Sequence, residues 1–402
     1  MDSSSQHHRQ PQTADRFAPF GTTIFSEMSA LANRYKAVNL SQGFPDFDGP
    51  DLGKQVAQRA MNQGHNQYAP MTGIAPLRHA ISRWAERISG ISCDPDREIT
   101  VTSGCTEAIA ATMLGLVNPG DEVILFEPYY DSYRACLAMA GATPRFVTMI
   151  ADEDGYRYKP EELRDAFSTK TRAILINTPH NPTGMVLNKA QLEEISSLCI
   201  EHDTIAISDE VYERLVYDDH VHRSIVSEPG MRDRTIVLSS AGKTFSLTGW
   251  KVGWAIAPEQ LSRGIRAAHQ FLTFSVPTPL QHGIAALLDD GENEIDALRT
   301  HYSRARSLLA EALHELGFRF SLPQGSYFIL ADHRHVSNRL GISDDVELCR
   351  WLPEHAGVAA IPPSAFYSNP TNGASLVRFA FCKQMSTIET AITRLRSAIP
   401  RA

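Results

Sequence analysis

The sequence predicts an α/β protein with a mainly parallel sheet, covered by helices on both faces, and a smaller α+β domain beside it. The first observation is that short, apolar, β-rich runs alternate with helix-length segments through the middle of the chain. Apolar strands separated by helices are typical of parallel sheets that are buried on both faces. The second observation is a change of pattern near residue 283, where longer charged helices begin and two later strands, "GSYFILAD" and "LVRFAF", follow.

Six runs in the middle of the chain have the length and composition of buried strands. They span residues 98–104, 122–128, 144–150, 172–178, 204–210 and 234–240. A seventh run, 252–258, follows the sixth too closely for a helical crossover, so we expect it to pair antiparallel. One intervening helical segment opens on Asn188 with Gln191 three residues later, which is the spacing of a capping box.

The composition is that of a globular protein and excludes several classes of partner. The 402 residues carry a formal net charge of -8 and no long basic run, so neither nucleic acid nor a membrane is an expected partner. The 6 cysteines are widely spaced without a Cys-x-x-Cys motif, which fits reduced thiols in the cytoplasm. Residues 1–17 are polar and lack the apolar core of a signal peptide, which predicts a flexible tail.

The tripeptide Gly242-Lys243-Thr244 raises the question of a nucleotide-binding phosphate loop. A Walker A loop needs a second glycine five residues before Gly242, where this chain has Val237 within an apolar strand. The backbone that would wrap around a nucleotide phosphate is therefore missing. The lysine needs another explanation, and the neighbouring strand ends supply one.

Polar side chains follow the strands at the sheet edge where doubly wound folds bind their ligands. The set comprises a helix-opening turn suited to an anion, an amide, a carboxylate, a phenol, a hydroxyl and a lysine: Gly104-Cys105-Thr106, Asn181, Asp209, Tyr212, Ser240 and Lys243. Pyridoxal 5'-phosphate needs such groups, because a lysine forms its Schiff base, an acid pairs with its ring nitrogen and donors hold its phosphate. We therefore expect this cofactor.

Each catalytic group has a role that follows from its chemistry. Lys243 forms the Schiff base with a pKa lowered by cationic and apolar neighbours, and after substrate displaces it the free amine is the general base for the Cα proton. Asp209 keeps the ring nitrogen protonated, which makes the ring a better electron sink. Asn181 and Tyr212 are expected to hydrogen-bond the ring oxygen.

Seven sequence blocks, in order, carry a resemblance to a known family: "NLSQGFPDFDGP", "NQYAPMTG", "NTPHNPTG", "SDEVYE", "SAGKTFSLTGWKVGW", "PQGSYF" and "VRFAF". With them the chain resembles class I, fold-type I pyridoxal-phosphate aminotransferases from about Gly21 to Arg396. It is most similar to the kynurenine aminotransferase (glutamine transaminase K) group and its bacterial methionine aminotransferase relatives. The resemblance implies a small domain of residues 18–48 with 283–402, and a large cofactor-binding domain of residues 49–282.

The resemblance also implies cofactor contacts. Tyr130 takes the place of the aromatic residue that stacks on the ring, and the phosphate contacts fall on Cys105, Thr106, Ser240 and Lys251. Many relatives have arginine at the last position, and lysine gives a point charge with less geometric control. Tyr68 matches a tyrosine that reaches the phosphate of the neighbouring subunit, which implies a homodimer with shared active sites.

The substrate site follows from the same resemblance. Gly43, Asn181 and Arg378 match the groups around the substrate α-carboxylate, which arginine can bind bidentately. Phe25 and Phe274 lie in stretches that line the side-chain pocket in this group. Neither stretch offers a cation for a side-chain carboxylate, so methionine and aromatic amino acids, with glutamine and kynurenine as weaker candidates, are expected as better donors than aspartate.

Alternatives remain open at this level. The same cofactor chemistry supports β-elimination from cysteine conjugates or an aspartate-type transamination, and a non-catalytic regulator could use such a domain as a ligand sensor. The His220/His222 and His333/His335 pairs could ligate metal, but no Cys or carboxylate pattern accompanies them. We expect exposed loops there and no metal.

Overall fold

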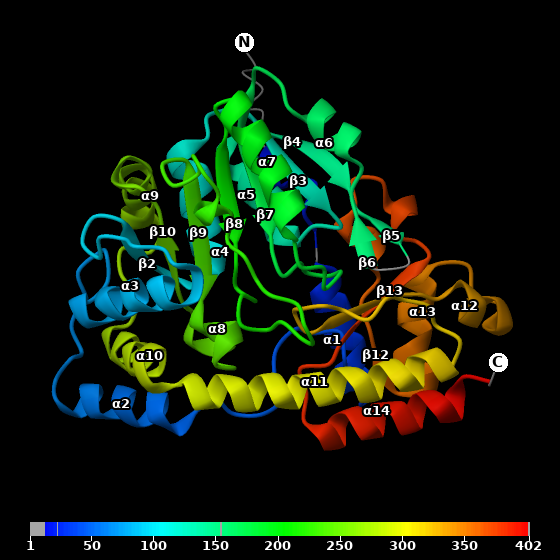
Figure 1. The fold of residues 1–402 in the computed structure, drawn as a ribbon. Helices are drawn as coiled ribbons and strands as arrows, with labels where there is room; N and C mark the ends of the chain where they lie inside the picture. The colour runs from blue at the N-terminus through cyan, green and yellow to red at the C-terminus, as the bar shows by residue number, and fades with distance from the viewer. Residues whose placement is uncertain (1–12, 22, 153–154, 401–402) are drawn as a thin grey trace, which may run out of the picture.

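The computed structural model describes residues 13–21, 23–152 and 155–400. Its main feature is a 7-stranded sheet of order β2-β10-β9-β8-β7-β3-β4 (Figure 1). The strands are β2 (Ile99–Ser103), β3 (Glu122–Glu127), β4 (Thr143–Thr148), β7 (Thr171–Asn177), β8 (Ile205–Asp209), β9 (Thr235–Ser240) and β10 (Val252–Ile256). All seven coincide with predicted runs to within a few residues.

Strand β10 is antiparallel to both of its neighbours, β2 and β9. The remaining pairs along the sheet, from β9 to β4, are parallel. The α/β fold class and the antiparallel seventh strand are therefore confirmed. The mixed sheet results from the short connection before β10, which leaves no room for a crossover helix.

Helices cover both faces of the sheet, because successive side chains of each strand point to opposite sides. On one face, Val123 and Leu125 pack with α4 (Gly104–Leu116) and α5 (Asp131–Ala140). On the other, Ile124 packs with the helices that follow β6 and β7. The helices of the main part are α2 (Asp51–Asn62), α3 (Ala75–Ser89), α6 (Pro160–Ala166), α7 (Lys189–Glu201), α8 (Ala241–Thr244), α9 (Glu259–Leu272) and α10 (Thr278–Asp290).

Helix α7 begins with the predicted capping box. The Asn188 side chain accepts from the Gln191 backbone N–H at 3.0 Å, and the Gln191 side chain accepts from the Asn188 N–H at 2.9 Å. A small hairpin, β5 (Ile150–Asp152) with β6 (Gly155–Arg157), extends from the far edge of the sheet.

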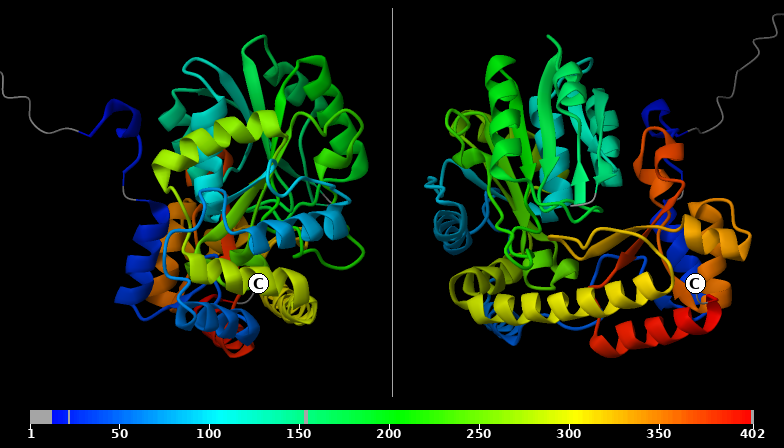
Figure 2. Two further views of the ribbon diagram at one scale, coloured as in Figure 1. Left: turned by 90° about the vertical axis from the view of Figure 1, so that its left-hand side faces the viewer. Right: turned by 45° about the vertical axis from the view of Figure 1, so that its right-hand side comes forward.

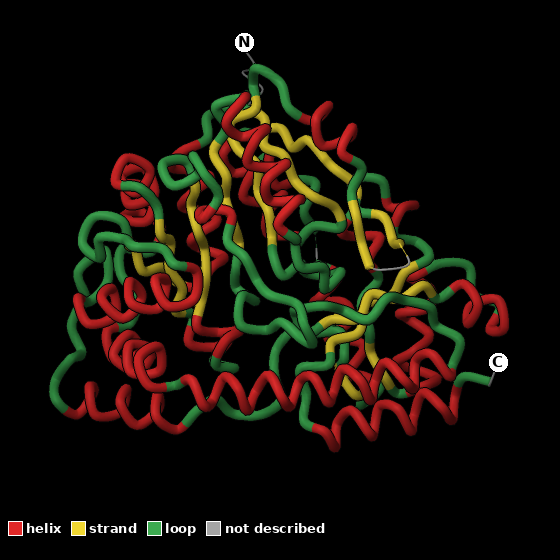
Figure 3. The backbone as a smooth tube through the Cα atoms, in the orientation of Figure 1, coloured by secondary structure: helices red, strands yellow, loops and turns green. Residues whose placement is uncertain are grey.

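The remaining elements form a second layer at one end of the sheet (Figures 1 and 2). The 24-residue helix α11 (Glu292–Glu315) runs beneath the large sheet and alongside α14 (Met385–Ala398). Two antiparallel strands, β11 (Phe328–Asp332) and β13 (Leu376–Ala380), accompany α12 (Arg334–Leu340) and α13 (Asp345–Trp351). Figure 3 shows this smaller group of strands below the main sheet.

An early segment of the chain joins this second layer. Strand β1 (Val38–Asn39) pairs in parallel with β12 (Val358–Ala359), and α1 (Ile24–Arg34) packs against the same strand. Residues 1–12 of the predicted tail lie outside the described residues, and Asp15–Phe17 form a 3-10 helix. No helix in the described part of the chain is both long enough and apolar enough to cross a membrane.

Candidate active site

A cavity of about 360 Å³ opens where the carboxyl ends of the parallel strands meet the second layer. It is lined by all but two of the predicted site residues: Phe25, Gly43, Cys105, Thr106, Tyr130, Asn181, Asp209, Tyr212, Ser240, Lys243, Lys251 and Arg378. The placement follows the rule for doubly wound sheets, in which ligands bind beyond the carboxyl ends of the strands. The roles assigned to these residues stay predictions.

One end of the cavity is built for an anion. Helix α4 begins there directly after β2, so its first backbone N–H groups lack intrahelical partners. Gly104 has φ +71, a conformation that favours glycine, and the Lys251 Nζ lies 3.0 Å from the position its Cβ would occupy. Lys251 itself has φ 54, which is uncommon for a residue with a side chain. This turn directs its ammonium toward the start of α4.

The carboxylate of Asp209 lies at the end of β8 and is 4% exposed. It accepts a hydrogen bond from the Tyr133 hydroxyl at 2.7 Å and one from the Val211 backbone N–H at 3.3 Å. Burial raises the pKa of Asp209, and the hydrogen bond from Tyr133 opposes that rise. The Cys105 thiol faces the same carboxylate.

The amine of Lys243 lies between two phenol rings, in a partly buried side chain. Its Nζ donates to the Gly43 carbonyl at 3.1 Å and lies 6.0 Å and 5.5 Å from the ring centres of Tyr212 and Tyr327. Burial lowers the pKa of Lys243 to about 8; the Cys382 and Asp209 groups oppose this lowering, and the Lys251 and Arg378 charges contribute to it. The direction agrees with the expectation from the sequence, and the role of Lys243 stays a prediction.

Arg378 reaches the cavity from β13 and is 2% exposed. Its guanidinium donates to the Ser41 carbonyl at 2.9 Å and to the Asn181 Oδ1 at 3.1 Å, and it lies 4.1 Å from the Phe328 ring centre. Burial lowers the pKa of Arg378 to about 10. Its Nε has no partner in the described part of the chain, although it is buried. A guanidinium with an unused donor can bind a carboxylate.

Gly43 lies beside Lys243 and Phe328, at a position where a side chain would not fit. A Cβ on Gly43 would lie 2.7 Å from the Phe328 Cζ. Its carbonyl accepts from Lys243 and also from the Tyr327 hydroxyl at 2.5 Å. Gly43 therefore fixes the resting position of the amine and leaves the Phe328 ring free to stack on Arg378.

Tyr68 and Phe274 do not line the cavity of their own chain. They stack edge to face with ring centres 5.5 Å apart and are 85% and 43% exposed. Phe274 therefore does not line the cavity within one subunit, and its place in the side-chain pocket stays a prediction. The segment after α9 turns outward at Phe274, which has φ 69, and this turn carries the ring away from the cavity.

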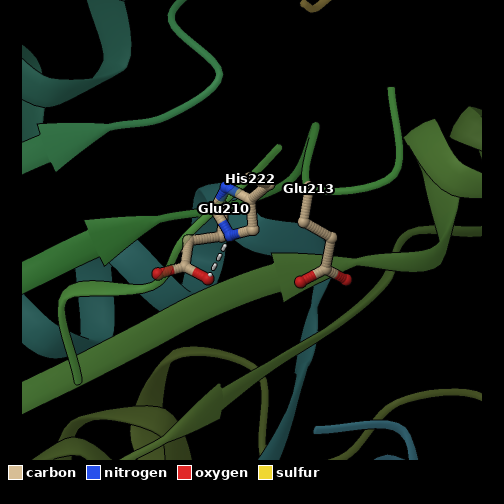
Figure 4. Close-up of side chains that lie close together, drawn as sticks. All are labelled: Glu210, Glu213 and His222. Atoms are coloured by element: carbon tan, nitrogen blue, oxygen red, sulfur yellow. Dashed lines mark hydrogen bonds and ion pairs between the residues drawn. The ribbon is translucent and has the colours of Figure 1, made fainter. Parts of the chain in front are cut away.

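The prediction of exposed loops is wrong for two of the four paired histidines. His222 is buried and its Nε2 lies 2.9 Å from the Glu210 Oε2, with Glu213 beside them (Figure 4). His333 is buried, and its Nδ1 lies 2.7 Å from the Ser337 Oγ. The sequence also indicated no carboxylates near these histidines, which is wrong for His222. The fold brings Glu210 and Glu213 next to its ring.

Among the further residues that line the cavity, two have ionisable side chains that sequence reasoning did not single out. Tyr133 and Asp131 both lie in the first turn of α5, directly after Tyr130. A helical period would have indicated Tyr133, because it stands three residues after Tyr130 and so lies on the same face. Burial raises the pKa of the Asp131 carboxyl, and the Arg378 charge opposes that rise.

Comparison with known proteins shows the family of the chain. The family model for aminotransferase class I and II matches residues 35–395. A solved structure of N-succinyldiaminopimelate aminotransferase from Mycobacterium tuberculosis superposes with a TM-score of 0.92 at 47% identity, covering 96% of this chain and 99% of that one.

Two curated relatives also match along nearly their whole length. The methionine aminotransferase of Escherichia coli (strain K12) is 43% identical over 94% of this chain and 96% of its own. Kynurenine–oxoglutarate transaminase 3 of Rattus norvegicus is 38% identical over 94% of this chain and 89% of its own.

The fold and these matches define a fold-type I aminotransferase. The chain belongs to the class I and II aminotransferases and is a transaminase of the pyridoxal-phosphate-dependent kind. The predicted resemblance to the methionine and kynurenine aminotransferases is confirmed.

Proposed function

We propose that this protein binds pyridoxal phosphate in the cavity and moves the amino group of a methionine-like or aromatic amino acid to a 2-oxo acid. The observation that carries the proposal is the meeting of four unlike groups in one cavity. These are the amine of Lys243, the carboxylate of Asp209, the anion site at the start of α4 and the guanidinium of Arg378.

The residues present fit that cofactor. The phosphate would be held by the first N–H groups of α4, the hydroxyls of Thr106 and Ser240, and the Lys251 ammonium. A Cβ on Gly104 would fill this cradle, since it would lie 3.0 Å from the Lys251 Nζ. The ring would lie beside Tyr130, with Asp209 facing its nitrogen. When bound, the cofactor supplies an electron sink that acidifies the substrate Cα proton.

The chain's own residues supply binding and proton transfer. Arg378 and Asn181 hold the α-carboxylate, which fixes the orientation of the Cα proton. Lys243, whose pKa is lowered to about 8, would take that proton at its Nζ as the general base. Asp209 retains the proton on the ring nitrogen. A 2-oxo acid then accepts the amino group in a second half-reaction, which gives ping-pong kinetics.

The donor follows from the charges that line the cavity. Its cations are Lys243, Lys251 and Arg378, and each already has a proposed role. Asp131 adds a carboxylate to the same wall, and Phe25 stacks on Phe366 with ring centres 5.7 Å apart. An acidic side chain would be desolvated there without a cation, whereas a thioether or aromatic side chain gains by burial.

A second candidate donor is N-succinyldiaminopimelate, which the name of the Mycobacterium tuberculosis relative at 47% identity supports. Such a donor carries further carboxylates beyond the α-carboxylate. It would need cations in addition to those that line the cavity of a single chain. Aspartate-type transamination meets the same objection.

We also propose that the protein is a cytoplasmic homodimer with shared active sites. An exposed apolar patch supports the second subunit: Tyr68, Leu114, Phe271, Leu272 and Phe274. Leu114, Phe271 and Leu272 border one shallow groove, and Tyr68 contacts Phe274. Exposed apolar patches of this kind mark protein–protein contacts. Residues 18–48 with 283–402 stay proposed as the small domain.

A donor panel tests the substrate proposal. Values of kcat/KM are measured for methionine, phenylalanine, kynurenine, glutamine, aspartate and N-succinyldiaminopimelate against one fixed 2-oxo acid. We expect methionine or an aromatic donor to lead and aspartate to trail. A clear lead for aspartate or for the succinylated donor overturns the proposed donor class. Release of pyruvate and ammonia from cysteine conjugates would indicate β-elimination instead.

Subunit mixing tests the shared site. Lys243→Ala and Tyr68→Ala are each expected to be deficient as homodimers. Refolding the two together produces hybrid dimers in which one site has both a wild-type Lys243 and a wild-type Tyr68. Recovery of activity on mixing supports a site built from two chains. If mass spectrometry shows that hybrid dimers have formed and activity does not recover, the shared site is contradicted.

A further inference from the structure

The buried phenol of Tyr133 has no role in the function proposed so far. Its hydroxyl donates to the Asp209 Oδ2 at 2.7 Å, and both side chains are almost fully buried. The ring of Tyr133 also meets the Tyr130 ring edge to face, with centres 5.6 Å apart and planes at 87°. Tyr133 therefore contacts both the acid expected to face the cofactor nitrogen and the ring expected to stack on the cofactor.

The environment of Asp209 makes this contact consequential. A carboxylate without an adequate set of partners in an apolar site takes up a proton instead of staying charged. Among the described residues, the donors to the Asp209 carboxylate are the Tyr133 phenol, the Val211 N–H at a long 3.3 Å and the weak Cys105 thiol. The hydrogen bond from the phenol is shorter than the one from the Val211 N–H.

The protonation of Tyr133 is also fixed. Burial and the charge of Asp209 raise its pKa well above the ordinary value, so the phenol keeps its proton and remains a donor. Because the phenol donates to the Oδ2 of Asp209, it fixes the orientation of the carboxylate and therefore the direction in which the Oδ1 points.

We propose that Tyr133 is a positioning residue that keeps the Asp209 carboxylate ionised and aimed at the cofactor ring nitrogen. This inference rests on the proposed function, since it needs pyridoxal phosphate to bind in the cavity. Without the phenol, Asp209 shares or gains a proton and no longer holds one on the ring nitrogen. The hydroxyl thereby acts on the cofactor through another side chain and does not touch it.

The chain offers a matched control. The Tyr158 hydroxyl donates to the Glu194 Oε2 at 3.1 Å, and Tyr158 is likewise buried. It lies in the core on the opposite face of the sheet, away from the cavity. Tyr133→Phe and Tyr158→Phe therefore each remove one hydrogen bond from a buried phenol to a carboxylate, and only the first removes it from the proposed site.

Two readouts distinguish positioning from structure. The first is the dissociation constant of pyridoxal phosphate from the cofactor-free protein, which we expect Tyr133→Phe to raise about tenfold. The second is the nitrogen NMR signal of ring-labelled cofactor. The wild type should keep the ring nitrogen protonated from about pH 6 to about pH 8, and Tyr133→Phe should lose that proton within the range. Tyr158→Phe should change neither.

A double-mutant cycle tests whether the effect passes through Asp209. In an Asp209→Asn background, the further change Tyr133→Phe should add little to the loss of cofactor affinity. Additive losses contradict the proposed route, and so does a Tyr133→Phe protein with wild-type affinity and a wild-type nitrogen signal.

The outcomes separate this inference from the proposed function. A wild-type protein that fails to bind pyridoxal phosphate overturns the function itself. A wild type that binds the cofactor with an unprotonated ring nitrogen at neutral pH overturns the inference alone, and this result needs no variant to fold.

Discussion

At the scale of single residues, Lys243 illustrates how burial prepares a group for chemistry. Its amine has one carbonyl acceptor, two phenol rings beside it and two cations nearby, so a larger share of it is neutral than in an exposed lysine. An ordinary exposed lysine would be almost fully protonated at neutral pH. The cavity thus supplies a nucleophilic amine before any cofactor arrives.

This pKa predicts the pH dependence of cofactor capture. The amine attacks an aldehyde only when neutral, so the capture rate should rise with pH through about 8 and level off above it. Stopped-flow absorbance after mixing cofactor-free protein with pyridoxal phosphate measures this rate. A midpoint near 10.5, the ordinary lysine value, contradicts the prediction. Borohydride reduction and peptide mapping should place the label on Lys243, and label on Lys251 would show that the assignment is wrong.

Arg378 gives a second prediction at this scale. We expect Arg378→Ala to raise KM for every donor by a similar factor, because the lost contact is to the α-carboxylate that all amino acids share. Removing one partner of such a charged pair costs about 2–5 kcal/mol. Steady-state kinetics over the donor panel measures it. A loss confined to acidic donors would assign Arg378 to the side chain instead.

At the scale of elements, the approach of β10 to the start of α4 shapes the anion site. Gly253 pairs with Thr102 of β2 and Ser240 of β9, and a Cβ there would lie 2.6 Å from the Gly104 carbonyl carbon. The obstacle is backbone, which cannot rotate away. The first turn of α4 can sit this close to the sheet only above a glycine.

We therefore expect Gly253→Ala to displace the first turn of α4. Overpacking of this kind costs about 1–3 kcal/mol of folding stability. Cofactor affinity should fall more than stability, because the displaced N–H groups form the anion site. Gly249→Ala is the control, since a Cβ at Gly249 meets nothing within 4 Å. Denaturation and cofactor titration of both proteins check this, and equal behaviour of the two contradicts it.

The elements also show which features the sequence predicts and which it does not. Each strand of the main sheet is an apolar run, and the short connection before Val252 predicts its antiparallel pairing, because these signals are local. The burial of His222 depends on Glu210 and Glu213, which reach it only after β8 is placed in the sheet. The outward turn at Phe274 depends on a backbone conformation that no local pattern indicates. The cavity was predicted well because most of its residues lie at strand ends.

At the scale of the whole molecule, the buried group of Glu210, Glu213 and His222 links stability to pH. Glu213 accepts from the Trp84 indole at 2.9 Å and the Ser239 hydroxyl at 3.3 Å. Burial, helped by the charge of Glu210, raises the pKa of Glu213 to about 7 from the ordinary 4.5. Because the folded-state pKa is the higher one, the stabilisation is complete below pH 4.5 and is lost as pH rises to about 7.

Glu213→Gln should remove most of this dependence. The glutamine oxygen can still accept from Trp84 and Ser239, and no charge is buried at alkaline pH. We expect the variant to gain up to about 3 kcal/mol over the wild type at pH 8, and little at pH 5. Urea denaturation at the two pH values measures the difference. A variant that is less stable than the wild type at pH 8 shows that the carboxylate itself is needed.

The cavity also joins residues from distant parts of the chain. Phe25 and Arg378 belong to one wall, while Lys243 stands between them in sequence, and the β1–β12 pairing holds the early and late segments together. During synthesis, α1 and β1 emerge long before β12 and β13 exist to receive them. The large sheet can form while the chain is still being synthesised. The cavity is complete only after β13 has emerged from the ribosome. Until then β1 and α1 lack the strand against which they pack, which makes them the segment that a chaperone would have most reason to hold.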